Sequence, residues 1–126
     1  MTAALTKNLI KYMNRIQEVV KTRLFLENWK KAIANLGFAF FDNETSLEEA
    51  LLPIDLKPNL NVINQLAHLL SCDDRLFLNV LLYFYDATLV SKHTIIQLST
   101  LDERRKRLLM HLVENYLPTH FEEVKQ

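Results

Sequence analysis

The sequence has one glycine, one cysteine and three prolines in 126 residues, and this scarcity argues against several classes of protein. Phosphate-binding loops and nucleophile turns are rich in glycine, and the chain contains neither a Walker A nor a GxGxxG motif. Cys72 has no second cysteine for an internal disulfide, which small secreted domains often carry. We therefore expect a protein of the reducing cytoplasm that is not an enzyme.

Long hydrophobic runs are also missing. The longest unbroken apolar stretch is residues 80–85, whereas a membrane-spanning helix needs about 20 residues. The N-terminus lacks the apolar core of a signal peptide. Hydrophobic residues make up 49% of the chain and charged residues 24%, which is typical of globular proteins. We expect one domain over residues 1–126 with no membrane association.

Helical spacing dominates the first third of the chain. Apolar residues recur at intervals of three and four, and the five-residue step from Val20 to Phe25 then turns the apolar face. The helix either changes its packing partners at this point or breaks near Thr22. Gly37 follows as a predicted helix end with a Schellman turn. The first apolar face consists of Leu9, Met13, Ile16 and Val20.

The middle of the chain is predicted to hold a loop, two short helices and a buried helix. We expect a loop at residues 38–44, although a short strand is an alternative, and a two-turn helix from Ser46 to Pro53. Asn59 is the predicted cap of the next helix. Ser71 or Asp73 then begins a helix over residues 73–87 that is apolar all round, which predicts burial at the centre of the fold.

The last third is predicted to add a short helix over residues 91–98 and a longer one after it. Thr100 and Glu103 form a predicted capping box, and Pro118 ends the helix. Residues 119–126 are expected to form a flexible tail. The sequence thus predicts an all-α fold, a compact bundle of five or six helices around residues 73–87.

A net charge of zero conceals an uneven distribution. Residues 1–31 carry seven basic and two acidic residues, whereas residues 32–103 carry three and ten. Lys7, Lys11 and Arg15 are predicted to form a basic ridge beside the first apolar face. A second basic cluster is a candidate site for nucleic-acid phosphates, with a solvated helix face as the alternative. It consists of Arg104, Arg105, Lys106 and Arg107.

Other candidate sites have simpler structural explanations. His68 and Cys72 are four residues apart, a spacing that suits two metal ligands if one helix runs through both, but a structural zinc site needs four. The aromatic residues could line a ligand pocket, although such residues more often fill a core. We therefore expect no metal and no cofactor.

The preferred functional hypothesis is a non-catalytic protein-protein interaction or regulatory protein that self-associates, with a homodimer as the expected form. Its predicted binding surface combines the N-terminal and last helices, where Lys7, Lys11 and Arg15 orient the partner and the Leu9, Met13, Ile16 and Val20 face supplies contact area. The alternatives are a nucleic-acid-binding regulator and a helical bundle, or enzyme, that binds a metal or small ligand.

Overall fold

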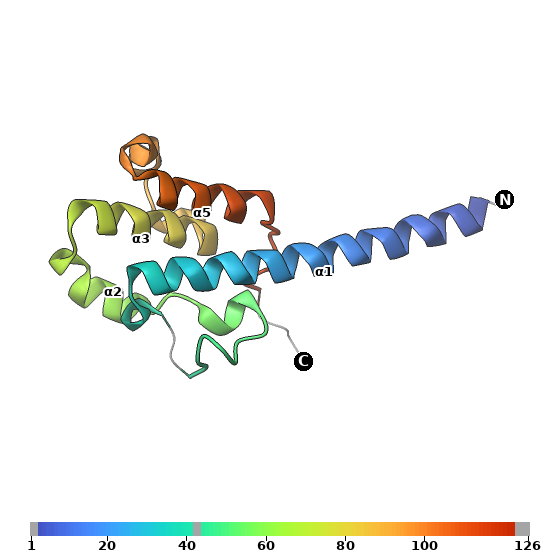
Figure 1. Cartoon of the computed structure of the whole chain (residues 1–126), viewed down its shortest axis with the longest axis horizontal. Coiled ribbons are helices and arrows are strands. Elements are labelled where there is room, and N and C mark those ends of the chain that lie inside the picture. The colour runs from blue at the N-terminus through green and yellow to red at the C-terminus, as the bar shows by residue number, and fades with distance from the viewer. Residues whose placement is uncertain (1–2, 42–43, 123–126) are drawn as a thin grey trace.

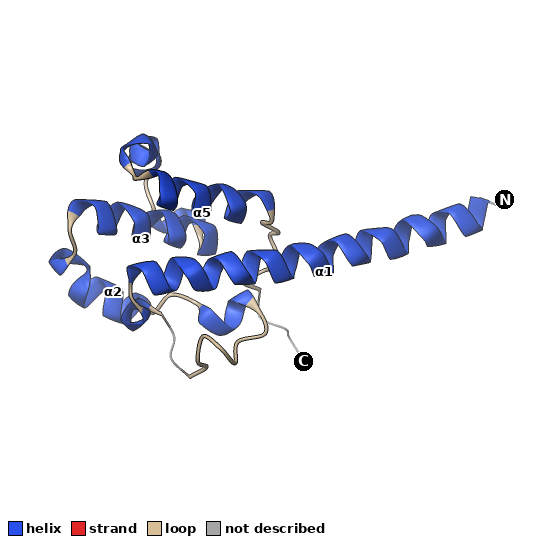
Figure 2. Ribbon diagram, viewed as in Figure 1, coloured by secondary structure: helices blue, strands red, loops and turns tan. Residues whose placement is uncertain are grey.

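The computed structural model describes residues 3–41 and 44–122, and within these ranges the chain forms helices and turns without a strand. Figures 1 and 2 show α2 to α5 gathered around the second half of α1, while its first half projects outward. The all-α prediction is confirmed. The α-helices are α1 (Ala3–Leu36), α2 (Leu60–Leu66), α3 (Cys72–Tyr85), α4 (Lys92–Ile96) and α5 (Glu103–Glu114), with 3₁₀ turns η1 (Phe38–Phe40), η2 (Pro53–Leu56), η3 (Ala67–Leu69), η4 (Ala87–Leu89) and η5 (Gln97–Thr100).

The predicted central helix is α3, two residues shorter at its C-terminal end than expected. Ser71 caps it, because its hydroxyl accepts a hydrogen bond from the Asp74 backbone N–H at 3.2 Å. One face remains open, since Tyr83 is 39% exposed. The buried side chains of α3 are Leu76, Phe77, Leu78, Val80, Leu81 and Leu82.

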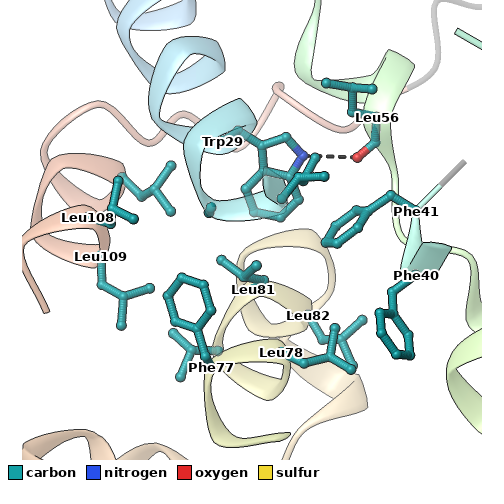
Figure 3. Packing of buried hydrophobic residues seen from close by; sticks show 14 of the residues in the cluster. Trp29, Phe40, Phe41, Leu56, Phe77, Leu78, Leu81, Leu82, Leu108 and Leu109 are labelled. Carbon is teal, nitrogen blue, oxygen red and sulfur yellow. Dashed lines mark hydrogen bonds between the residues drawn. The ribbon is translucent and has the colours of Figure 1, made fainter. Parts of the chain in front are cut away.

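Aromatic side chains fill the core between α1 and α3, as Figure 3 shows. Phe25, Trp29, Phe41 and Phe77 are each 0% exposed. The indole N–H of Trp29 donates to the Leu56 carbonyl at 2.9 Å, so the one polar atom of this buried side chain is satisfied. These residues stabilise the core and do not line an open pocket.

Two predicted helix starts are wrong. Ser46 makes only one turn, in which its hydroxyl accepts from the Glu49 N–H, and the helical segment nearby is η2, which begins at Pro53. At the last helix, Asp102 is the cap and accepts from the Arg105 N–H at 2.8 Å. Thr100 instead ends η5, where its hydroxyl donates to the Gln97 carbonyl. Asp is as good a cap as Thr, and it lies next to the helix.

The helix α1 ends at Leu36, directly before Gly37, as predicted. The turn at Gly37, however, is not the predicted Schellman turn. Gly37 has φ 128° and ψ 129°, which is outside the left-handed helical region that a Schellman turn uses. Residues 38–40 form η1, and Phe41 makes an isolated antiparallel bridge with Pro58. The predicted loop at residues 38–44 is therefore a tight turn in its described part, and residues 42–43 lie outside the described residues.

The prediction of a flexible tail from residue 119 is wrong for His120 and Phe121. His120 is 5% exposed and its ring lies 4.4 Å from the ring of Phe25, while Phe121 packs against Trp29 at 5.0 Å. His120 and Phe121 thus belong to the core region around α1, because aromatic rings gain more from burial than a polar tail would. Residues 123–126 lie outside the described part of the chain.

Candidate interaction surface

The helix α1 is continuous through Thr22, so the change of apolar face reflects a change of surroundings. Every residue from 3 to 20 is exposed, and the first buried side chain is Phe25. The Thr22 hydroxyl donates to the Glu18 carbonyl at 2.8 Å, which leaves the helical ladder intact. We call residues 3–20 the projecting half; at 1.5 Å per residue it is about 27 Å long.

The projecting half carries an exposed apolar surface on one side. Its large apolar side chains are between 49% and 63% exposed. Leu5, Tyr12 and Val19 follow one another at intervals of seven, beside the predicted face, and this spacing was a signal that the sequence prediction missed. We call the apolar stripe the six residues Leu5, Leu9, Tyr12, Met13, Ile16 and Val20, which lie within about 100° of the helix circumference. Val19 lies about 20° outside it, at the edge next to Tyr12.

The stripe faces away from the body of the protein, by which we mean the second half of α1 and the elements that pack around it. At about 100° per residue, its centre lies roughly 150° around the helix from the buried face of Phe25, Trp29 and Ile33. Further along α1, the side that continues the stripe carries charged residues, among them Arg23 and Glu27, which are exposed. The apolar side opposite the core is therefore confined to the part of α1 that projects.

Lys7, Lys11 and Arg15 are all exposed, but their ridge does not lie beside the stripe as predicted. The same helical geometry places most of it on the opposite side, in line with the buried face further along α1. The three cations are thus available to solvent without interrupting the apolar stripe. These cations make the side of the projecting half that lies opposite the stripe positively charged.

The second basic cluster is not a continuous exposed patch. Arg105 is 9% exposed; its Nη2 atom lies 2.6 Å from Asp74 Oδ1, and its Nε–H donates to Asn35 Oδ1 at 2.8 Å. Lys106 is half-buried and pairs with Glu103 at 3.3 Å, while Arg104 and Arg107 are exposed. Arg105 therefore joins three helices and is unavailable to phosphates.

The last helix offers a second, smaller apolar surface. Leu98 and Leu109 line a shallow groove of about 520 Å³ together with Met110 and Val113. The side chains of Met110 and Val113 are 62% and 64% exposed. This groove lies on the last helix, on which the sequence predicts part of a binding surface.

The candidate metal ligands do not share a helix. The α2 helix ends at Leu66, His68 lies in η3, and Cys72 begins α3, so the four-residue spacing does not place them on one helical face. Within residues 3–41 and 44–122, no group of three or more potential ligands lies close enough together to hold a metal ion.

The chain has no significant match among models of protein families, curated protein sequences or solved structures. None of the helices in the described ranges is both long enough and apolar enough to span a bilayer.

Proposed function

We propose that this chain is a non-catalytic protein-protein interaction module and that it binds its partner through the apolar stripe of α1. The observation that carries the proposal is the position of the stripe, on a projecting helix and facing away from the core to which the same helix contributes. The groove on α5 is a second, smaller contact surface in this proposal.

Covering the exposed stripe with a partner would be energetically favourable. A single helix of this length is only marginally stable in water without packing along one face. Burying the exposed half of a Leu, Ile, Val or Met side chain yields on the order of 1 kcal/mol. Five such side chains together with Tyr12 contribute several kcal/mol towards association and towards the stability of the projecting half.

The chemistry of the stripe also favours binding over catalysis. Apolar side chains give contact area but no group that accepts or donates a proton, apart from the Tyr12 hydroxyl. The proposal includes the cytoplasm as the location, since the chain has Cys72 as its only cysteine and a reducing compartment keeps such a thiol intact.

A charge-matched pair of variants tests the proposal. The double variant Leu9→Asp, Ile16→Asp places two carboxylates in the stripe; the control Asn8→Asp, Asn14→Asp adds the same charge to exposed positions outside it. Sedimentation and affinity capture from the native host should show that the first variant loses protein association and the control retains it. Equal association by both variants would contradict the proposal.

A second experiment tests the main alternative, which is nucleic-acid binding. Fluorescence anisotropy with duplex and single-stranded DNA at two salt concentrations reports phosphate binding, which weakens steeply as salt rises. We expect little binding, because Arg105 is engaged inside the protein. Tight, salt-dependent binding that survives the stripe variant would replace the proposed function with nucleic-acid recognition.

A further inference from the structure

We infer that the partner of the apolar stripe is a second copy of this chain, whose α1 lies antiparallel to the first around a two-fold axis between Tyr12 and Met13. This inference rests on the proposed function and names the partner for the same surface. It follows from the order of the stripe residues and from their spacing.

The stripe has the same spacing when it is read in either direction. Around the point between Tyr12 and Met13, Leu9 is matched by Ile16 at the same distance along the helix, and Leu5 is matched by Val20. A two-fold axis through this point therefore brings each apolar side chain of one copy opposite an apolar side chain of the other. Such self-complementarity is what an isologous dimer interface requires.

The spacing also suits a pair of helices. Leu5 and Tyr12 are seven residues apart, as are Leu9 and Ile16, and Met13 and Val20. A seven-residue repeat keeps an apolar seam in contact with a partner helix when the two helices supercoil. The side of α1 that continues the stripe becomes charged at Arg23 and Glu27, so the seam ends where the body of the protein begins.

Charge does not choose the direction of such a pair. Lys7, Lys11 and Arg15 are exposed, and most of this ridge lies on the side of α1 opposite the stripe. These cations therefore point away from the seam in a parallel pair and in an antiparallel pair alike. The antiparallel direction follows from the order of the stripe residues.

The placement of the bodies agrees with this direction. The buried face of α1 lies nearly opposite the stripe, so each body stands behind its own helix and away from the seam. Figure 1 shows the projecting half extending clear of the body. Two copies therefore meet along the stripes, with their bodies at opposite ends of the helix pair.

Single cysteines in a Cys72→Ser background test the direction and register. Under mild oxidation, Met13→Cys should form a disulfide-linked dimer, because the axis passes next to it. Leu5→Cys alone and Val20→Cys alone should not, but a mixture of the two variants should cross-link. Asn14→Cys, next to the axis but outside the stripe, is the matched control and should remain monomeric. Cross-linking of Leu5→Cys alone would show a parallel pair and overturn the inference.

The oligomeric state of the unmodified chain is the second measurement. Sedimentation equilibrium should show a dimer, and the Leu9→Asp, Ile16→Asp variant should raise its dissociation constant at least about a hundredfold, because two charges would be buried in each helix. The Asn8→Asp, Asn14→Asp control should dimerise like the unmodified chain.

A monomer at all concentrations overturns the inference, and two further measurements then decide the proposed function. If the monomer binds a different protein through the stripe, the second copy is wrong as the partner but the proposed function stands. If it instead binds vesicles of phosphatidylserine and phosphatidylcholine in a stripe-dependent way, or nothing at all, both fall.

Discussion

Arg105 shows how one residue in a basic run can differ from its neighbours. Its guanidinium lies 4.8 Å from the centre of the Phe77 ring, contacts Asp74 of α3 and donates to Asn35 of α1. The planar group satisfies a carboxylate and an amide at once, and a lysine at this position would not do so. Arg105 therefore connects three helices at one point.

We predict that Arg105→Ala destabilises the fold by about 2 kcal/mol, less than the loss of a fully buried ion pair, because Asp74 keeps 38% of its side chain in solvent. The neighbouring Arg104→Ala, at an exposed position, should change stability by no more than about 0.5 kcal/mol. Urea unfolding of both variants measures the difference. Equal effects would mean that the Arg105 contacts contribute no net stability.

His120 connects the end of the described chain to α1. Its Nε2–H donates to the Asn115 carbonyl at 2.8 Å, and its ring stacks on Phe25. Burial lowers the pKa of His120 from its usual 6.5 by more than this hydrogen bond raises it. The folded protein therefore holds His120 in its neutral form more strongly than the unfolded chain does.

This shift gives stability a defined dependence on pH. The contribution of His120 is fully present above pH 6.5 and declines as the pH falls below 6.5, because the unfolded chain then binds a proton that the folded protein does not. We predict that His120→Gln flattens the pH dependence of the unfolding free energy just below pH 6.5. The control His68→Gln, at an exposed histidine, should leave it unchanged. Identical profiles for the three proteins would refute the prediction.

At the level of elements, α1 serves two roles along one continuous helix. Its second half buries Phe25, Trp29 and Ile33 in the core, whereas its first half presents an apolar side in nearly the opposite direction. A helix that served the core alone would carry polar residues on its outer side throughout. The inversion of the apolar side near Thr22 is therefore the feature on which the proposed contact surface rests.

Most elements could be predicted from local chemistry. The caps at Asn59 and Ser71 and the apolar content of α3 are local signals, and the structure agrees with them. The Ser46 helix was wrong because acidic residues after a serine favour a turn as readily as a helix, and Pro53 leaves little room for more. The packing of His120 and Phe121 depends on rings far away in the sequence, which local spacing does not reveal.

The proposed interaction surface could be predicted only in part. The spacing of Leu9, Met13, Ile16 and Val20 predicts an apolar face, but the pattern is the same whether that face is covered within the chain or by a partner. Which half of α1 enters the core depends on α3 and α5, which pack on it from more distant parts of the sequence. The burial of Arg105 among basic neighbours could not be predicted for the same reason.

For the molecule as a whole, the two halves of α1 should differ in stability. The body holds the second half by a continuous core, while the projecting half depends on its own helical hydrogen bonds and on whatever covers the stripe. Binding of a partner stabilises the state that binds, and for self-association this effect grows with protein concentration. The stability of the projecting half is therefore expected to depend on concentration.

Hydrogen exchange tests this expectation directly. We predict that the backbone amides of the projecting half, residues 3–20, exchange quickly in dilute solution and become protected as the concentration rises, because dimerisation removes the stripe from water. The amides of α3 should be protected at both concentrations. In the Leu9→Asp, Ile16→Asp variant the projecting half should exchange quickly throughout. Protection that is equal at both concentrations in the unmodified chain would mean that the helix is stable alone, and the physical need for a second copy would disappear.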